Sequence, residues 1–196
     1  RQRQAVLVSP EPAQGRHRRL RGQRLPQQVR AGRGRGAPPA WRERITTLLE
    51  SGAVRCWGEG ANGRLGYGDS NDILSPAGIM PVTIGAQVEQ ITAGSEHTCA
   101  LTVDGEVFCW GNGELGRLGY GNTQSIGDDE APTQMGFVAL AQPASQISAG
   151  RAHTCALLED GSVSCWGHGG QGRLGYGSVE DLGDDEVPAD YDPVPH

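Results

Sequence analysis

Residues 91–121 read ITAGSEHTCALTVDGEVFCWGNGELGRLGYG, and residues 147–177 read ISAGRAHTCALLEDGSVSCWGHGGQGRLGYG. The two stretches align without a gap and agree at 21 of 31 positions. A third, partial copy starts near Leu48, with its own Cys-Trp-Gly at residues 56–58 and Leu-Gly-Tyr-Gly at residues 65–68. The Cys-Trp-Gly motif therefore recurs after 53 and then 56 residues. Self-similarity at such a period indicates a solenoid, a propeller or another repeat array.

Each copy predicts short β-strands. In the copy at residues 91–121, residues 91–93 form a strand that ends at a glycine. Residues 97–102 and 106–110 alternate between apolar and polar side chains. The three residues between the last two strands, 103–105, end in glycine, which is typical of a hairpin with a type I turn and a G1 bulge. Four short strands per repeat that close radially make a β-propeller blade, so we expect an all-β fold.

The hairpin register brings cysteines together. It places Cys99 opposite Cys109, at a site where the two backbones approach most closely, and the same count places Cys155 opposite Cys165. We expect two disulfides, each closing a short loop and adding about 2–3 kcal/mol at most. The alternative is reduced, half-buried thiols; zinc is disfavoured because no Cys-x-x-Cys is present. Cys56 is expected to be unpaired, since Thr46 stands ten residues before it.

The repeat resembles that of the regulator of chromosome condensation, RCC1. The motif Ala-Gly-x-x-His-x-x-x-Leu-x-x-x-Gly-x-Val-x-x-Trp-Gly, followed by Gly-x-Leu-Gly-x-Gly, carries the resemblance over about residues 48–177. The resemblance implies a β-propeller, usually of seven blades, of which this chain would be a part. The cysteine pairs are more similar to secreted bacterial members than to nuclear ones, which implies an extracellular, periplasmic or cell-surface location.

Charge divides the chain. All 17 basic residues are arginine, and residues 1–44 hold 12 of them against two glutamates, whereas residues 45–196 hold 5 arginines against 21 acidic residues. An acidic body disfavours nucleic acid as its partner, and no apolar run reaches the roughly 18 residues of a spanning helix.

We divide the chain into residues 1–46, a partial blade with its loop (47–87), a blade with a long loop (88–146), and a blade with an acidic tail (147–196).

Two interpretations of residues 1–46 stay open. The resemblance to the repeat stops abruptly upstream of Leu48, and a shifted reading frame of GC-rich codons for residues 41–46 yields Ala-Gly-Ala-His-His, close to the Ala-Gly-x-x-His that the repeat expects there. The segment would then be an out-of-frame reading of an earlier blade. The alternative is a genuine, disordered basic arm, with Arg-rich runs at residues 16–19 and 32–36, that binds nucleic acid.

Several recurring side chains have structural interpretations. His97 and His153 share one repeat position with no recurring acid and nucleophile beside them, so we expect them to bond within the structure rather than to catalyse. The tryptophans are expected in the core between blades, and three arginines stand where the RCC1 family has glutamine; we expect them to pair with acidic loops. These residues are Trp57, Trp110, Trp166, Arg64, Arg117 and Arg173.

Two acidic loops are candidate cation sites. Gly-Asp-Asp-Glu recurs at residues 127–130 and 183–186. Oxygen-rich loops can hold calcium, but the spacing is not that of an EF-hand, and a solvated acidic turn is the default interpretation. The weak calcium candidates are Asp128, Asp129, Glu130, Asp184, Asp185 and Glu186.

We predict a non-catalytic scaffold that binds a protein partner through its variable loops, residues 69–87 and 122–146, since propellers hold such loops on a rigid frame. No nucleophile elbow, Walker loop or zinc-protease motif is present in the sequence, and no cofactor is expected. One alternative is nucleotide exchange on a small GTPase, which disulfides disfavour because that partner is intracellular. The other is a glycan-active propeller enzyme, which would need an acid cluster confined to one blade.

Overall fold

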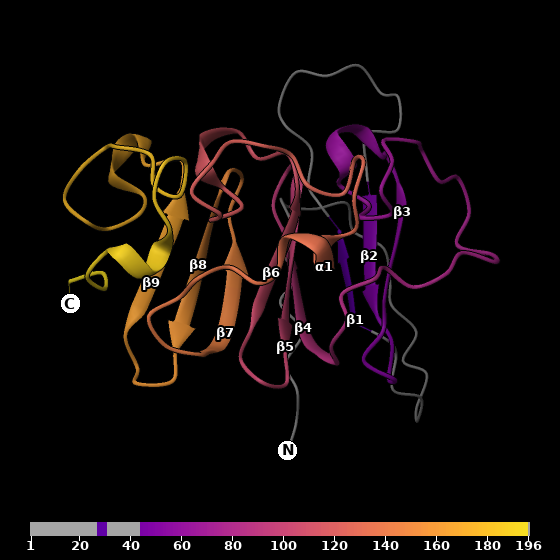
Figure 1. The fold of residues 1–196 in the computed structure, drawn as a ribbon, viewed down its shortest axis with the longest axis horizontal. Coiled ribbons are helices and arrows are strands. Elements are labelled where there is room, and N and C mark those ends of the chain that lie inside the picture. The colour runs from indigo at the N-terminus through magenta and orange to yellow at the C-terminus, as the bar shows by residue number, and fades with distance from the viewer. Residues whose placement is uncertain (1–26, 31–43, 196) are drawn as a thin grey trace, which may run out of the picture.

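Three antiparallel sheets stand side by side along the molecule (Figure 1). The structure is a computed structural model that describes residues 27–30 and 44–195. Each sheet has three strands in sequential order, which is the arrangement of successive propeller blades. Blade 1 consists of β1 (Gln27–Arg30), β2 (Arg44–Leu48) and β3 (Val54–Gly58); blade 2 of β4 (Val88–Ala93), β5 (His97–Thr102) and β6 (Val107–Gly111); blade 3 of β7 (Ala144–Ala149), β8 (His153–Leu158) and β9 (Val163–Gly167).

The helices are single turns in the connections. Each Cys-Trp-Gly strand is followed by a 3₁₀ turn: η1 (Ala61–Gly63), η2 (Glu114–Gly116) and η3 (Gly170–Gly172). α1 (Pro132–Met135) and η4 (Pro188–Asp190) lie in the loops that leave blades 2 and 3. Within the described residues no helix is long and apolar enough to cross a membrane. Because the strands form antiparallel sheets and the helices are single turns, the all-β fold class is confirmed.

The predicted hairpin register is confirmed. Cys99 lies opposite Cys109 and Cys155 opposite Cys165, with Cα–Cα distances of 4.1 and 4.0 Å. These distances are those of non-hydrogen-bonded antiparallel pairs. Gly105 ends the turn with a φ of 83°, a left-handed conformation that favours glycine.

Each sheet has three strands, and the fourth segment of each blade pairs only locally. The fourth position holds one isolated bridge, such as Gly111 to Ile126, and one further hydrogen bond, such as Val138 N to Val107 O at 2.7 Å. In blades 1 and 3 the equivalent segments carry Pro81 and Pro193 directly before the bonded valine. Because neighbouring N–H groups of a strand point to opposite sides, each proline stands where its N–H would face away from the sheet, a position that an edge strand tolerates.

The apolar core runs through the spaces between the blades. Trp110 and Trp166 are fully buried, while Trp57 is partly exposed. Each buried indole lies on a glycine of the preceding blade: a Cβ on Gly66 would come within 2.9 Å of Trp110 Nε1, and one on Gly119 within 2.7 Å of Trp166 Nε1. The recurring Leu-Gly-Tyr-Gly motif thus leaves room for the tryptophan of the next blade.

The boundary predicted at residue 46 falls inside blade 1. Residues 44–46 belong to β2, whose register pairs Thr46 with Cys56. Residues 27–30, also within the predicted arm, form β1 and pair with β2. The Arg-rich runs at residues 16–19 and 32–36, on which the basic-arm interpretation depends, lie outside the described residues.

Candidate binding surface

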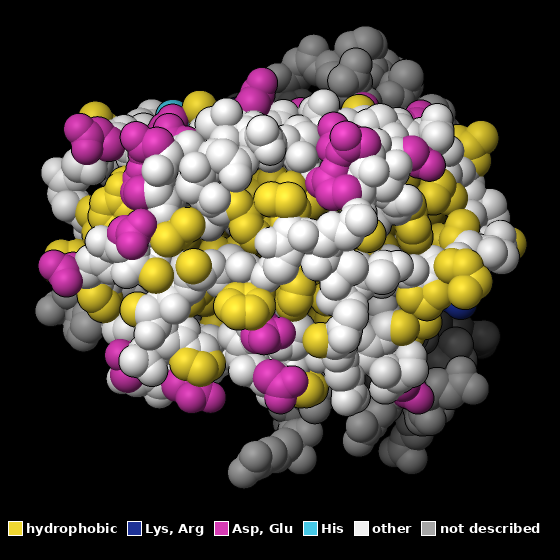
Figure 2. All heavy atoms as spheres, viewed as in Figure 1, with side chains coloured by type: hydrophobic (Ala, Val, Ile, Leu, Met, Phe, Trp, Pro, Cys, Tyr) yellow, Lys and Arg dark blue, Asp and Glu magenta, His cyan; other side chains and the backbone are white. Residues whose placement is uncertain are grey.

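The loop between β3 and β4 projects from blade 1 (Figure 1). Its apolar side chains face solvent, with Leu74 93% and Met80 75% exposed. Blades 2 and 3 carry Gly-Asp-Asp-Glu directly after the bridge residue, whereas blade 1 carries the apolar stretch 74–81 there. This loop is therefore chemically unlike its two counterparts. In Figure 2 hydrophobic side chains reach the surface among acidic ones.

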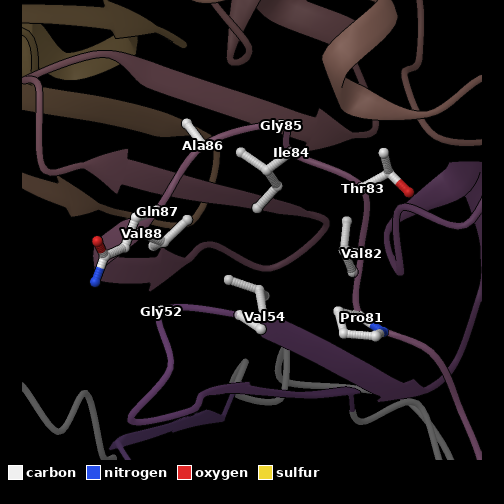
Figure 3. Close-up of a pocket in the computed structure, with 11 residues that line it drawn as sticks. Gly52, Val54, Pro81, Val82, Thr83, Ile84, Gly85, Ala86, Gln87 and Val88 are labelled. Carbon is white, nitrogen blue, oxygen red and sulfur yellow. The ribbon is translucent and has the colours of Figure 1, made fainter.

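A groove lies at the base of this loop. It encloses about 430 Å³ between the start of β3 and residues 81–88. The side chains of Val54 and Ile84 face one another across it (Figure 3). Its lining contains no titratable side chain, and its valines and isoleucine are buried, so the groove offers no group for acid–base chemistry.

The loop that leaves blade 2 adds a second apolar element. Phe137 is 54% exposed and packs edge-on against Phe108, with ring centroids 6.4 Å apart. Met135 in the adjacent α1 is also exposed. The two loops predicted to bind a partner, residues 69–87 and 122–146, therefore both present large apolar side chains to solvent.

The recurring arginines meet acidic groups in two of the three blades. Arg64 pairs with Glu59 at 3.1 Å and with Glu96 of the next blade at 3.7 Å. Arg117 pairs with Glu96 at 3.2 Å and with Glu114 at 3.9 Å. Glu96 thus joins the arginines of blades 1 and 2.

Arg173 differs from its two counterparts. Its Nε donates to the Gly170 carbonyl at 2.6 Å, and Nη2 donates to Gln171 Oε1 at 3.3 Å. Within residues 27–30 and 44–195 it forms no salt bridge. The expectation of pairing with acidic groups therefore describes the first two arginines and not this one.

The repeat histidine joins one blade to the next. His97 Nε2 lies 2.9 Å from Thr154 Oγ1, and that hydroxyl lies 3.2 Å from the Arg117 carbonyl. Since the hydroxyl donates its proton to the carbonyl, Nε2 carries the imidazole proton and donates to Thr154. Burial, with the charges of Arg44 and Arg117 as smaller causes, lowers the pKa of His97 well below its usual value. A neutral histidine at this position therefore bonds blades rather than transferring protons.

The role of the equivalent residue in blade 1 was not predicted. Arg44 stands at the histidine position, is fully buried, and donates from Nε to Thr98 Oγ1 at 3.0 Å. Its other nitrogens donate to the Gly94, Ser95 and His97 carbonyls. Burial lowers the pKa of Arg44 to about 10, so it stays charged at neutral pH. Counting two residues back from Thr46 would have found this position.

Four cysteines form two disulfides and the fifth is free, as the strand register predicts. Cys99 is joined to Cys109 and Cys155 to Cys165. Cys56 is free and buried, and its Sγ lies 3.3 Å from Thr46 Oγ1. Burial raises the pKa of the Cys56 thiol to about 11. The thiol is therefore protonated at neutral pH and a poor nucleophile.

The two acidic loops dock on the preceding blade. Gly68 N donates to the Gly127 carbonyl at 3.0 Å, and a Cβ on Gly63 would lie 2.3 Å from the backbone of Asp128. The carboxylates of residues 128–130 lie within 4.8 Å of one another, as do those of residues 184–186. Glu130 accepts from Gly127 N at 3.1 Å, and burial raises its pKa. The clusters have a structural explanation as caps of these turns.

A histidine–aspartate pair in blade 3 was not predicted. His168 Nδ1 lies 2.8 Å from Asp181 Oδ1, which also accepts from Gly169 N. The equivalent positions hold Glu59 and Asp72 in blade 1. The pair is therefore confined to one blade, and only a column-by-column comparison of the repeats would have found it.

Family models identify the repeats. A model described as the regulator of chromosome condensation (RCC1) repeat matches residues 51–101 and 104–157. A second RCC1 repeat model matches residues 88–117 and 144–173. The matched segments span more than half of the chain and include most of blades 2 and 3.

Two relatives are eukaryotic. The ultraviolet-B receptor UVR8 of Arabidopsis thaliana is 38% identical over 129 residues, which is 65% of this chain and 28% of the relative. The E3 ubiquitin-protein ligase HERC2 of Homo sapiens is 37% identical over 137 residues, which is 68% of this chain and 3% of the relative. The chain thus spans less than a third of either protein.

Solved structures share the fold. Human WBSCR16 has a TM-score of 0.63 and 23% identity, over 87% of this chain and 39% of that one. Yeast RCC1 (Prp20), solved bound to Kap60, has a TM-score of 0.57 and 17% identity, over 78% and 35%. At these identities the likeness supports the propeller fold alone.

Proposed function

Because the chain belongs to the RCC1 repeat family, we propose that it is a non-catalytic scaffold whose blades hold protein-binding loops. The observation that carries this proposal is the apolar loop of blade 1, which holds Leu74 and Met80 in solvent. Exposed apolar patches mark sites of protein association, and aromatic and methionine side chains are enriched in them. We place the binding surface on residues 69–87 and 122–146.

The test is whether substitutions in the blade 1 loop weaken the binding of a partner captured by cross-linking. Proteins cross-linked to the chain in its native extract are identified. The protein with the strongest cross-linking signal is purified, and its Kd for the chain is measured. The double substitution Leu74→Ser/Met80→Ser is expected to weaken that Kd at least tenfold, since hot-spot side chains each contribute about 1–2 kcal/mol. The matched control is Val179→Ser, which removes an exposed apolar side chain from the loop after β9. Equal affinity for all three proteins would contradict the proposal.

The cysteine pairs support a location. We propose that the chain is a secreted, bacterial-type member of the family that works outside the reducing cytoplasm, in an extracellular, periplasmic or cell-surface setting. Protein isolated under denaturing conditions without reductant should then contain one titratable thiol per chain, that of Cys56. Five thiols per chain would contradict this location.

Nucleotide exchange is the alternative to exclude. Addition of the chain to a small GTPase loaded with fluorescent GDP is expected to leave the release rate unchanged. Acceleration that is abolished by a blade substitution would replace the scaffold proposal with an exchange factor.

A further inference from the structure

The loop of blade 1 at residues 69–87 is continuous with the acidic turn and α1 of blade 2. At the start of the loop, a Cβ on Gly68 would lie 3.6 Å from the backbone of Glu130. Near its end, a Cβ on Gly85 would lie 3.0 Å from Thr133 Oγ1 in α1. The blade 2 segment therefore borders the loop at both ends. We call residues 69–87 and 127–137 together the acidic–apolar surface.

Both parts of the acidic–apolar surface hold large apolar side chains in solvent. Leu74 and Met80 of the loop are 93% and 75% exposed, and Met135 and Phe137 of the blade 2 segment are 38% and 54% exposed. In Figure 2 hydrophobic side chains form a band across the viewed face, with acidic side chains above and below it. Exposed apolar groups of this kind mark surfaces that associate with other proteins.

Carboxylates accompany these apolar groups. Asp69 and Asp72 each accept a backbone N–H at 2.9 Å, and Glu130 accepts one at 3.1 Å. These bonds hold the negative charges on their turns instead of leaving them on free side chains. The acidic residues of the surface are Asp69, Asp72, Asp128, Asp129 and Glu130.

The acidic–apolar surface contains no lysine, arginine or histidine. In the part of the chain that the structure describes, its five carboxylates form no salt bridge. Burial first, and the neighbouring Asp128 and Asp129 in addition, raise the pKa of Glu130. A cation that approaches this turn would relieve the repulsion between the carboxylates. The charge of the surface therefore favours a partner of opposite sign.

We propose that the acidic–apolar surface binds a protein segment in which arginine or lysine stands next to apolar side chains. This inference rests on the proposed function and names the chemistry of the partner. Apolar side chains of the segment cover Leu74, Met80 and Phe137, and its cations pair with the carboxylates of the surface. Charges of opposite sign speed the encounter and select the partner, whereas a few buried apolar side chains supply most of the affinity.

The test is the binding of three synthetic peptides of equal length to the full chain. The first contains leucine and arginine, the second has glutamate in place of arginine, and the third has serine in place of leucine. Calorimetry should show that the leucine–arginine peptide binds about tenfold more tightly than either of the others. Its Kd should rise about fivefold between about 0.05 and about 0.5 M salt, because salt screens exposed charges.

Variants of the chain locate the binding site of the leucine–arginine peptide. Asp72→Asn/Asp129→Asn is expected to weaken binding about fivefold, since it removes two exposed ion pairs. Asparagine keeps an oxygen that accepts a backbone N–H, so the turns should stay folded. Leu74→Ser/Met80→Ser is expected to weaken binding about tenfold. The matched control is Glu159→Gln, which removes an exposed carboxylate from the turn between β8 and β9 and should bind normally.

Three results would overturn the inference. They are equal affinity for the arginine and glutamate peptides, no binding at about millimolar peptide, and a loss for Glu159→Gln as large as that for Asp72→Asn/Asp129→Asn. The last would show that net charge attracts the peptide without a site. A captured partner that Leu74→Ser/Met80→Ser releases, but that presents acidic residues to the chain, would overturn this inference and leave the proposed function intact.

Discussion

At the scale of single residues, the repeat histidine explains the glycine three positions before it. A Cβ on Gly94 would lie 2.2 Å from His97 Cε1, and one on Gly150 would lie 2.1 Å from His153 Cε1. The imidazole therefore occupies the space that any other residue would fill. The Ala-Gly-x-x-His motif is a packing unit in which glycine allows the ring to reach the next blade.

Gly94→Ala is expected to lower the free energy of unfolding by about 2–3 kcal/mol, because the new Cβ would lie 2.2 Å from the buried His97 ring and 2.6 Å from the Gly150 carbonyl oxygen. Gly161→Ala is the control: it has a φ of 88° but no atom within 4 Å, so it should cost only about 1 kcal/mol of backbone strain. Urea unfolding measures both. Equal losses for the two variants would show that the ring is not responsible.

Thr46 marks the place of a missing disulfide. Its register with Cys56 is that of Cys99 with Cys109. Thr46→Cys is expected to form a third disulfide and to raise the free energy of unfolding by about 2–3 kcal/mol. Mass spectrometry of the alkylated protein and melting with and without reductant measure this, with Thr46→Ser as control. Two free thiols in the oxidised variant would refute the equivalence of the blades.

At the scale of elements, backbone ladders join the strands within a blade, whereas side chains and a few isolated backbone bonds join one blade to the next. Gln90 shows this, since its amide donates to the Ile147 carbonyl at 2.8 Å and accepts from the Ile147 amide at 3.0 Å. Thr92 accepts from the Ala149 amide at 2.9 Å. Polar side chains on β4 thus satisfy the backbone of β7 where no ladder connects the two sheets.

The bond from His97 predicts a pH dependence. Its pKa is lowered in the folded state, so below the unfolded value of about 6.5 the unfolded chain binds a proton that the folded chain does not. Stability should fall by about 1.4 kcal/mol per pH unit below 6.5 until the folded pKa is reached, in addition to other groups. His97→Gln should remove this contribution. Identical slopes for wild type and variant between pH 6.5 and 5 would contradict it.

The sequence predicted the strands and their register better than the side-chain contacts between the blades. Register followed from the three-residue loop at 103–105, because turn length fixes the pairing of its flanks. The role of Arg44 did not follow, since an arginine and a histidine become equivalent only when both point at a threonine some 54 to 57 residues later. Likewise, Arg173 has no salt bridge among the described residues, and Ala152 stands where blade 2 has Glu96. Such features need the blades to be placed first.

At the scale of the whole molecule, the rigid blades form the core, and the exposed loops are the parts that we propose bind the partner. Strands β4–β9 and the tryptophans between them form one buried core, whereas the large exposed apolar side chains lie mostly in turns and connecting loops. Binding residues are concentrated on loops held by rigid scaffolds. The proposed function places recognition on residues 69–87 and 122–146.

Amide hydrogen exchange of the chain with and without its captured partner tests this division most directly. We predict that the partner slows exchange in residues 69–87 and 122–146 and leaves β5 and β8 unchanged, because those strands are already protected. Slowed exchange confined to β9 and η3 would indicate that the partner contacts blade 3 instead. Protection absent from both loops would contradict the claim that this protein binds its partner through them.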